Sequence, residues 1–391
     1  MNILQISTCY LPHYGGIEQV ACDLSRILVK QGHRTKVICF NDNPQTVVDS
    51  YEGQEVIRIG YRRKLASQAI SLRYFFEMRK VIKDFRPDVI HIHLPNPFVA
   101  AFLLLANPEC RITLHWHSDI IRQKLLRRLY APFESALLRN AVKIAATTLG
   151  DDDVSNLALL RNAVKIAATT QIYAENSERL KHYLDKVSVI PCIIADVFLD
   201  TMTDKDRHEV ARIKERYDGK KIIFSIGVHR EYKGLRYLID AAGYLTDDYE
   251  VVIAGSGPLS AALKKQADDL HLRNVHFIGR ISDEEKRVYL WASDVYAFPS
   301  ITKNEAFGIA LAEALYCGLP AVTFTIEGSG VNYVNQDGVT GMEVHEFDAE
   351  KYAHALMSVS KEKYGENAKQ WAKEHFTESA IYEQVKQFFG E

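Results

Sequence analysis

Residues 304–320 read NEAFGIALAEALYCGLP and carry two glutamates, Glu305 and Glu313, with seven residues between them. The spacing of the apolar residues predicts a helix, with Glu305 at its mouth and Glu313 on it. Because an α-helix rises 1.5 Å per residue, the two carboxylates would lie about 12 Å apart along its axis. That separation suits the two ends of one extended ligand. A surface helix with two solvated glutamates is the alternative.

Backbone groups at the predicted start of this helix offer a place for an anion. The first N–H groups of a helix have no partner inside it, so Phe307, Gly308 and Ile309 can donate to a phosphate. Gly308 also lets the backbone come close to the anion. A nucleotide sugar fits this pattern, with its sugar at Glu305, its pyrophosphate on the N–H groups and its ribose at Glu313.

Outward from this stretch, short apolar runs alternate with segments of helical period, which predicts parallel sheets with crossover helices. The predicted strands lie at 2–7, 35–40, 88–93 and 111–116, and then at 221–226, 250–254, 274–278, 295–298 and 320–324. Two similar halves therefore predict an α/β fold of two Rossmann-like, doubly wound domains with a cleft between them.

The domain boundaries follow from where this pattern lapses. Turn-forming and charged residues gather at 191–205, where we place the linker. We expect an N-terminal domain at 1–195 and a C-terminal domain at 196–367. The last segment, 368–391, carries an amphipathic helical run from 368 to 389 that we expect to pack back toward the N-terminal domain.

The composition narrows the class of protein. Apolar residues make up 47% of the 391 and charged residues 25%, as in globular proteins, and a net charge of −2 argues against nucleic acid as a partner. The six cysteines show no CxxC pair, so we expect reduced thiols. The chain begins directly with a strand, MNILQIS, without signal-peptide features, and the apolar run 98–106 is too short to span a bilayer. A cytoplasmic location is expected.

One internal repeat interrupts the first half. The sequence ALLRNAVKIAATT stands at 136–148 and again at 158–170, separated by LGDDDVSNL. Each copy encodes a helix end and one strand, whereas the sheet needs one such strand, so we interpret the repeat as a late insertion or an engineered duplication. The aspartates at 151–153 lack an accompanying ligand pattern, and no metal site is expected.

Further motifs give a specific resemblance. They are PHYGGIEQV (12–20), PDVIHIH (87–93), LHWHSD (114–119), YKGLRYLIDA (232–241), VVIAGSGPL (251–259), VHFIGRIS (275–282), YAFPS (296–300), CGLPAV (317–322) and DGVTGMEV (337–344). Together with the two spaced glutamates they resemble the family four retaining glycosyltransferases, which adopt the GT-B fold. The resemblance extends over nearly the whole chain.

In the first half, the resemblance implies three site residues. Gly15 and Gly16 would form the loop after the first strand, where the backbone approaches the donor phosphate or the acceptor. His117 matches the active-site histidine near the transferred sugar. His115 alternates to the same strand face and is the reserve candidate.

In the second half, the resemblance implies the phosphate-binding charges. Lys233 matches the lysine that meets the leaving diphosphate. Arg230 stands two positions after Val228, which occupies the usual place of the partner arginine, and we assign the role to Arg230. Arg280 and Ile281 match the turn whose backbone binds the base.

The resemblance implies a retaining, metal-independent hexosyltransferase without a cofactor. Its partners would be a nucleotide-sugar donor, first of all GDP-mannose, and a glycan or lipid-linked acceptor of cell-envelope polysaccharide synthesis. A nucleotide-sugar epimerase or a phosphorylase on the same scaffold, or a non-catalytic nucleotide-sugar binder, are the alternatives.

Residues 62–86 bear on a membrane partner. They contain eight basic residues against Glu77 and Asp84, interleaved with aromatic and aliphatic residues, and 122–128 adds four more. A basic amphipathic helix can lie on an anionic leaflet, which would make the protein peripheral at the inner face of the cell membrane. An ordinary helix with a solvated basic face is the alternative.

Overall fold

The computed structural model describes residues 1–12, 15–41, 43–65, 68–118, 163–195, 198 and 201–390. The chain folds into two compact units. Unit 1 comprises Met1–Ile190 together with Tyr382–Glu391, and unit 2 comprises Pro191–Ile381. The sequence placed the first boundary at 195/196. The chain thus returns to unit 1 for its last ten residues, at a point later than the 368 expected from the sequence.

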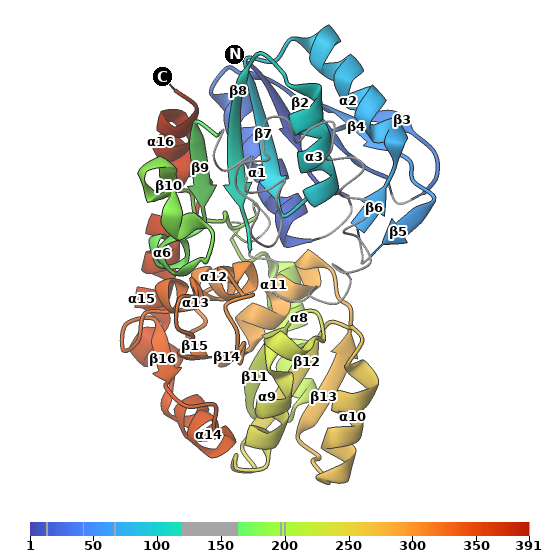
Figure 1. Cartoon of the computed structure of the whole chain (residues 1–391). Helices are drawn as coiled ribbons and strands as arrows, with labels where there is room; N and C mark the ends of the chain where they lie inside the picture. The colour runs from blue at the N-terminus through green and yellow to red at the C-terminus, as the bar shows by residue number, and fades with distance from the viewer. Residues whose placement is uncertain are drawn as a thin grey trace. The chain divides into compact units, whose positions relative to one another are not determined.

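Unit 1 is built on an eight-stranded sheet with the order β10-β9-β8-β7-β1-β2-β4-β3 (Figure 1). Every neighbouring pair is parallel except β3 and β4. The strands are β1 (Asn2–Ile6), β2 (Arg34–Phe40), β3 (Val47–Tyr51), β4 (Gln54–Ile59), β7 (Val89–Leu94), β8 (Arg111–Trp116), β9 (Lys165–Ala168) and β10 (Val187–Val189), with a separate small hairpin of β5 (Arg63–Leu65) and β6 (Gln68–Ile70). All four strands predicted in this half are present.

The β3–β4 hairpin is an element that the sequence analysis missed. Its two-residue turn is Glu52-Gly53, and both residues have positive φ, 50° and 79°. A two-residue hairpin loop of this kind matches the twist of the strands it joins, and glycine at its second position is the sequence signal for it. The signal was weak because β3 is exposed along most of its length and shows no apolar face.

The repeat contributes one strand through its second copy. β9 lies inside 158–170 and pairs in parallel with β8 on one side and β10 on the other. The first copy, 136–148, and the three aspartates at 151–153 lie outside the described residues.

The helices of unit 1 are α1 (Gly16–Lys30), α2 (Leu72–Phe85), α3 (Pro97–Ala106) and α6 (Gln171–Asn176), followed by two short 3-10 turns at Leu180–His182 and Leu184–Lys186. The apolar run at 98–106 forms most of α3, whose Val99, Ala100 and Leu103 are fully buried, so α3 is a core helix. None of the helices in the described part of the chain has the length and apolar character that a membrane crossing requires.

Unit 2 contains a fully parallel six-stranded sheet with the order β13-β12-β11-β14-β15-β16 (Figure 1). Its strands are β11 (Lys221–Ile226), β12 (Tyr249–Ala254), β13 (Val275–Gly279), β14 (Val295–Phe298), β15 (Ala321–Phe324) and β16 (Gly341–Val344). Renumbered within the unit, this is the order 3-2-1-4-5-6 of a doubly wound sheet. The order reverses between β11 and β14, and ligands of such sheets bind beyond the carboxyl ends of the strands at that switch point.

The helices of unit 2 are α8 (Asp204–Arg216), the 3-10 turn η3 (Glu231–Lys233), α9 (Leu235–Ala242), α10 (Ser260–Asp269), α11 (Asp283–Ala292), α12 (Ile309–Tyr316), α13 (Val331–Val334), α14 (Ala349–Ser358), α15 (Lys361–His375) and α16 (Glu378–Phe389). The predicted helical run from 368 to 389 is two helices. Thr377 separates them, because its hydroxyl accepts from the N–H of Ala380 at 3.3 Å and so caps α16. The residues of α16 from Tyr382 onward belong to unit 1.

Two glycines of unit 2 provide a matched test of the close contact between the loop after β11 and the backbone of Pro299. Gly234 (φ 61°) and Gly219 (φ 70°) share the left-handed backbone, but a Cβ on Gly234 would lie 1.9 Å from the carbonyl oxygen of Pro299, whereas one on Gly219 would meet nothing within 4 Å. We expect Gly219→Ala to cost about 1 kcal/mol for the backbone strain. Gly234→Ala should add about 1–3 kcal/mol of overpacking. Urea denaturation of both variants measures this, and equal midpoints would contradict the close approach.

Candidate active site

The switch point of unit 2 is formed by two loops, which follow β11 and β14. The N–H of Ile301 donates to the carbonyl oxygen of Tyr232 at 2.9 Å and so ties the loops together. Across this junction the Lys233 ammonium forms an ion pair with the Glu305 carboxylate. The structure thus brings together two residues that are more than seventy positions apart in the sequence, both from the predicted site.

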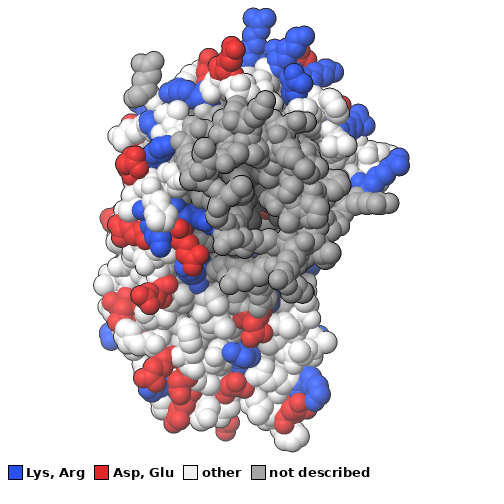
Figure 2. Space-filling view, in the orientation of Figure 1, with Lys and Arg blue, Asp and Glu red and all other residues white. Residues whose placement is uncertain are grey.

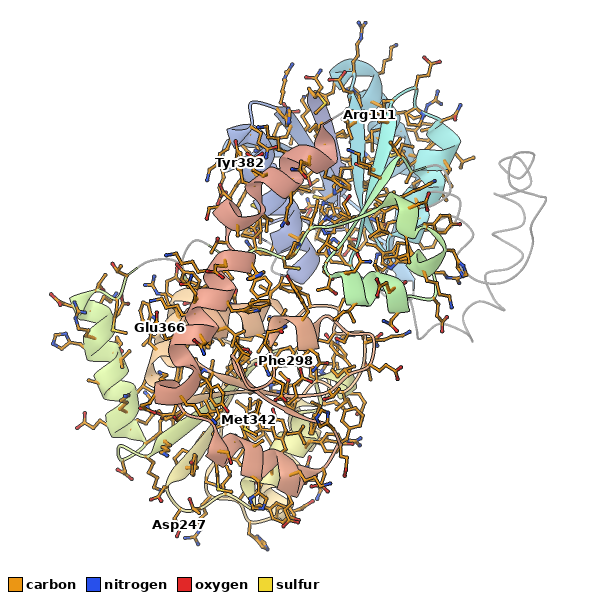
Figure 3. All side chains as sticks on the ribbon, turned by 90° about the vertical axis from the view of Figure 1, so that its left-hand side faces the viewer. Arg111, Asp247, Phe298, Met342, Glu366 and Tyr382 are labelled. Atoms are coloured by element: carbon orange, nitrogen blue, oxygen red, sulfur yellow. The ribbon has the colours of Figure 1, made fainter. Side chains whose placement is uncertain are left out.

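The surroundings of this ion pair favour a charged lysine. Its Nζ lies 5.1 Å from the ring centre of Phe298, at the end of β14 (Figure 3), and 5.4 Å from that of Tyr232. Burial lowers the pKa of Lys233, but the attraction of Glu305 outweighs it and raises that pKa above its ordinary value. The hydroxyl of Ser300 donates to Glu305 at 3.2 Å and orients the carboxylate. The pair therefore holds a fixed positive charge beside a fixed acceptor.

The amino end of α12 lies directly after Glu305. Among the described residues, the backbone N–H groups of Phe307, Gly308, Ile309 and Ala310 meet no acceptor, and the first to find one is that of Leu311, at 3.0 Å from the carbonyl oxygen of Gly308. These free donors lie where the sequence predicts an anion site.

Glycine is required at position 308 for two reasons. Its φ is 96°, a conformation that side chains disfavour, and a Cβ would lie 3.0 Å from the ring of Phe298. The helix begins at Ile309, so Glu305 lies in the preceding loop. The separation of about 12 Å, which assumed helical rise from Glu305 to Glu313, does not apply over that interval.

Glu313 is buried, which corrects the alternative of two solvated glutamates. It is 4% exposed, and its carboxylate pairs with the Lys286 ammonium of α11 at 2.9 Å. Lys286 also contacts Asp283 at 2.8 Å and the ring of Phe198 at 4.6 Å. Burial raises the pKa of Glu313, while Lys286 opposes this rise. Sequence analysis missed Lys286, because nothing in its surrounding run SDEEKR marks it.

Two arginines lie at the same carboxyl edge of the sheet. Arg230 is exposed at the end of the loop after β11, and no ion pair of its guanidinium is found among the described residues. Arg280 is exposed just after β13 and donates from Nε to Ser256 at 2.7 Å. Ile281 is half-buried and directly precedes Ser282, the N-cap of α11. Of the predicted donor-site residues of unit 2, Arg280 is exposed and Ile281 and Ile309 are half-buried, whereas Phe307, Gly308 and Glu313 are buried.

Unit 1 contains a buried cluster of four histidines. His91 and His93 lie on β7, His115 lies on β8 and His117 directly follows it. The rings of His115 and His117 stack at 4.5 Å with an interplanar angle of 4°, and those of His93 and His117 at 5.2 Å and 16°. His117 Nε2 lies 2.9 Å from His93 Nδ1. The predicted catalytic histidine is therefore one end of an imidazole array.

These four rings are neutral at physiological pH. Burial lowers the pKa of His91, His93 and His117 well below the ordinary value, and it lowers that of His115 to about 3. His117 keeps 8% of its surface exposed, whereas the other three are fully buried. His115 was the reserve candidate for the active-site role. Its complete burial removes it from contact with a substrate.

Three of the four rings have the grouping of a metal site. One nitrogen each of His91, His93 and His115 lies within 4.8 Å of the others. Both ring nitrogens of His93 already have partners, His117 and Gln5, each at 2.9 Å. Among the described residues, free nitrogens therefore remain on His91 and His115, which is two ligands where a zinc site needs three or four.

Gly15 and Gly16 lie at the start of α1 and are exposed. The loop that leads to them is held by Arg58, whose guanidinium donates to the carbonyl oxygens of Tyr10 at 3.0 Å and Leu11 at 2.6 Å. These two glycines and His117 all follow the carboxyl ends of parallel strands, β1 and β8, of the eight-stranded sheet. Asp119 of the LHWHSD motif lies outside the described residues.

Two open α/β units, each built on a largely parallel sheet, and the reversed strand order of unit 2 are features of the GT-B fold. Solved structures agree with the fold: sucrose-phosphate synthase from Thermosynechococcus elongatus superimposes with a TM-score of 0.73 at 18% identity, over 99% of this chain and 98% of that one.

The sequence comparisons give the family. Residues 14–150 match the model described as Glycosyltransferase Family 4, and residues 206–376 match that described as Glycosyl transferases group 1. The chain is 32% identical to the O-antigen chain mannosyltransferase C of Escherichia coli, over 96% of this chain and 95% of the relative. It is 34% identical to the D-rhamnosyltransferase WbpZ of Pseudomonas aeruginosa, over 88% and 82%. The chain belongs to the family 4 glycosyltransferases.

The Lys233–Glu305 pair predicts a non-additive effect on stability. Lys233→Met or Glu305→Gln alone leaves one group without its partner, which we expect to cost about 2 kcal/mol, below the 3–5 kcal/mol of a fully buried pair. The discount applies because the side chains keep 16% and 12% exposure. The double variant should recover most of this loss. Thermal unfolding of all three variants completes the cycle, and strictly additive losses would contradict the pairing.

Proposed function

We propose that this chain transfers a hexosyl group, first of all mannose from GDP-mannose, to a glycan or lipid-linked acceptor of cell-envelope polysaccharide synthesis, with retention of configuration and without a metal or cofactor. The observation that carries the proposal is the Lys233–Glu305 pair beside the free N–H groups of α12, at the switch point of unit 2. Both a diphosphate and a sugar hydroxyl find their partners there.

The donor is assigned to unit 2 in an extended pose. Its diphosphate accepts from the backbone N–H groups of Phe307, Gly308 and Ile309 and faces the charge of Lys233. Glu305 accepts hydrogen bonds from the sugar hydroxyls. The ribose is assigned to the Glu313 end of α12, where Lys286 holds that carboxylate at 2.9 Å. The base is assigned to the backbone at Arg280 and Ile281.

In the proposed reaction the bond between the anomeric carbon and the diphosphate oxygen breaks, and the acceptor oxygen forms the new bond on the same face. The acceptor proton passes to the departing phosphate oxygen, so no group of the protein needs to store it. Charge grows on the leaving diphosphate, and Lys233, Arg230 and the N–H groups of α12 neutralise it. His117 and the backbone of Gly15 and Gly16 are the contributions of unit 1 to the sugar and the acceptor.

The donor sugar has two candidates supported by relatives. A mannosyltransferase and a D-rhamnosyltransferase match this chain at 32% and 34% identity. D-rhamnose is mannose without the 6-hydroxyl, so the two donors differ by one hydrogen-bonding group. A site that forms a hydrogen bond with that hydroxyl has a much lower kcat/KM for the deoxy sugar. Thermal-shift and transfer assays with GDP-mannose, GDP-D-rhamnose, UDP-glucose and a dTDP-sugar distinguish the candidates.

The matched test compares two ion pairs of unit 2. Lys233→Met/Glu305→Gln should lower kcat/KM at least 10³-fold, about 4 kcal/mol of transition-state stabilisation. As control, Lys220→Met/Glu250→Gln removes the pair that joins Nζ to Oε1 at 2.7 Å at the opposite, amino edge of the sheet, and it should keep transfer near wild type. Equal losses in the two double variants would overturn the assignment.

The same assay separates the alternative activities. Conversion of the donor without any acceptor would indicate an epimerase, and absorbance of a lysine-bound pyridoxal group would indicate a phosphorylase. Donor binding with neither transfer nor slow hydrolysis would indicate a non-catalytic binder. Each of these results would replace the proposed transfer.

We also propose a peripheral membrane contact through α2. Its Tyr74 and Met78 are fully buried, whereas Leu72 and Phe76 each keep 66% of their surface exposed. Exposed basic residues of the same helix are Arg73, Arg79, Lys80 and Lys83. Figure 2 shows Lys and Arg side chains gathered at the top of the view, over the position that α2 takes in Figure 1. Apolar side chains flanked by basic ones suit an anionic leaflet.

Vesicle sedimentation tests this contact. Leu72→Ser/Phe76→Ser should reduce binding to anionic phosphatidylglycerol vesicles about tenfold or more, since two exposed apolar side chains contribute about 1.5–3 kcal/mol each when buried. Val48→Ser, a 64% exposed apolar residue on β3, serves as control and should bind like wild type. Wild-type protein that stays in the supernatant would refute the contact.

A further inference from the structure

A chain of buried hydrogen bonds leads from His117 into the core of unit 1. His117 Nε2 contacts His93 Nδ1 at 2.9 Å, and His93 Nε2 contacts Gln5 Oε1 at 2.9 Å. The Gln5 amide nitrogen then donates to Ser25 Oγ at 2.6 Å and to the carbonyl oxygen of Ala21 at 3.3 Å. Apart from His117, with its 8% exposure, the side chains of this chain are fully buried.

The donor and acceptor of every hydrogen bond in this chain follow from its buried end, at Gln5, Ser25 and the carbonyl of Ala21. A backbone carbonyl only accepts, so the Gln5 atom facing Ala21 is the NH₂ group. Ser25 agrees, because its single hydroxyl proton is already donated to the Ala21 carbonyl at 3.0 Å and Oγ can only accept from Gln5. The Gln5 oxygen therefore faces His93, which must donate to it from Nε2.

The same logic then sets the two imidazoles. A neutral imidazole carries one proton, so a His93 that donates from Nε2 presents a bare Nδ1. His117 must donate to that lone pair from its own Nε2. The lone pair of His117 is consequently on Nδ1, an atom without a partner among the described residues.

We infer that His93, oriented by Gln5, is a positioning residue that holds His117 in the Nε2–H tautomer and presents its Nδ1 as a hydrogen-bond acceptor for a hydroxyl of the sugar substrates. The inference rests on the proposed function for its catalytic meaning, while the tautomer itself is a property of unit 1 alone. Free histidine exchanges its proton between the two nitrogens, and the hydrogen bond of one nitrogen decides which form is present.

The inference explains why two buried histidines are in contact. Burial holds both rings neutral, with pKa values well below the ordinary one. A neutral ring at His93 can accept from His117, whereas a protonated one would present a second donor and break the contact. The array therefore works only in the uncharged state that its burial imposes.

His115 provides the matched control within the same cluster. Its ring stacks on that of His117 at 4.5 Å, yet both of its nitrogens are buried and find no hydrogen-bond partner among the described residues. Replacing an unpaired buried imidazole by an apolar side chain is near neutral for stability. His115→Leu thus removes a neighbouring imidazole of equal burial and leaves the hydrogen-bonded chain intact.

Nitrogen NMR of the full-length protein, labelled with ¹⁵N-histidine, measures the tautomer directly. The His117 signals, identified by their loss in His117→Gln, should show a protonated Nε2 and a bare Nδ1. His93→Leu should return His117 to a mixture of tautomers. His93→Asn should preserve the wild-type pattern, because the Asn oxygen occupies the place of Nδ1 and accepts the same bond. A protonated Nδ1 in the wild-type protein would overturn the inference.

Kinetics of the same variants then test whether the His117 tautomer matters for sugar transfer. His93→Leu should lower kcat at least tenfold with little change in donor KM, and His93→Asn should restore most of it, while His115→Leu stays near wild type. Full kcat in His93→Leu would refute the positioning role. If instead His117→Gln itself keeps full turnover, the proposed role of His117 fails, and the NMR result still decides the tautomer.

Discussion

The ion pair between Lys233 and Glu305 is the interaction on which the candidate donor site depends. The strand order of unit 2 reverses between β11 and β14, and the pair joins the two loops that leave those strands. A glycine at 234 lets one loop pass against the backbone of the other, and a glycine at 308 opens the amino end of α12. The result, among the described residues, is a lysine, a carboxylate and a row of unpaired N–H groups beyond the carboxyl ends of one parallel sheet. In the proposed function this arrangement receives a ligand that carries both a diphosphate and hydroxyls.

The polar side chains at the corresponding end of the unit 1 sheet are uncharged. Here the carboxyl ends of β1, β7 and β8 bury uncharged groups, four imidazoles and one amide, in place of ions. Buried polar groups are stable only when they are hydrogen-bonded, and Gln5, His93 and His117 satisfy one another in a single chain. His115 and part of His91 stay unpaired within the same cluster. These three strands therefore carry a continuous chain of buried hydrogen bonds and, beside it, packed imidazole rings with unpaired nitrogens.

Much of the fold could be predicted because strands of parallel sheets are buried on both faces and read as short apolar runs. All nine predicted strands are present. The exposed β3 shows no such run and was not predicted. The edge strand β16 was not predicted either, because its residues lie in the motif DGVTGMEV, which was interpreted only as part of the family resemblance. Helix ends were less accurate, since the polar residue Thr377, which splits the last helical run, looks like any surface position. The site was predicted as a set of residues, by resemblance, and its internal contacts were not.

The sequence by itself determined the α/β class, the two-unit organisation, the family, and the positions of Lys233, Glu305, Gly308 and His117. These are local patterns, set by periodicity and by motifs of a few residues. Only the tertiary structure decided that Lys233 pairs with Glu305, that Glu313 is buried against Lys286, and that His117 is bonded through His93 to Gln5. Each of those contacts joins residues from different strands or helices. Such contacts depend on the order in which parallel strands are laid side by side, which no single stretch of sequence encodes.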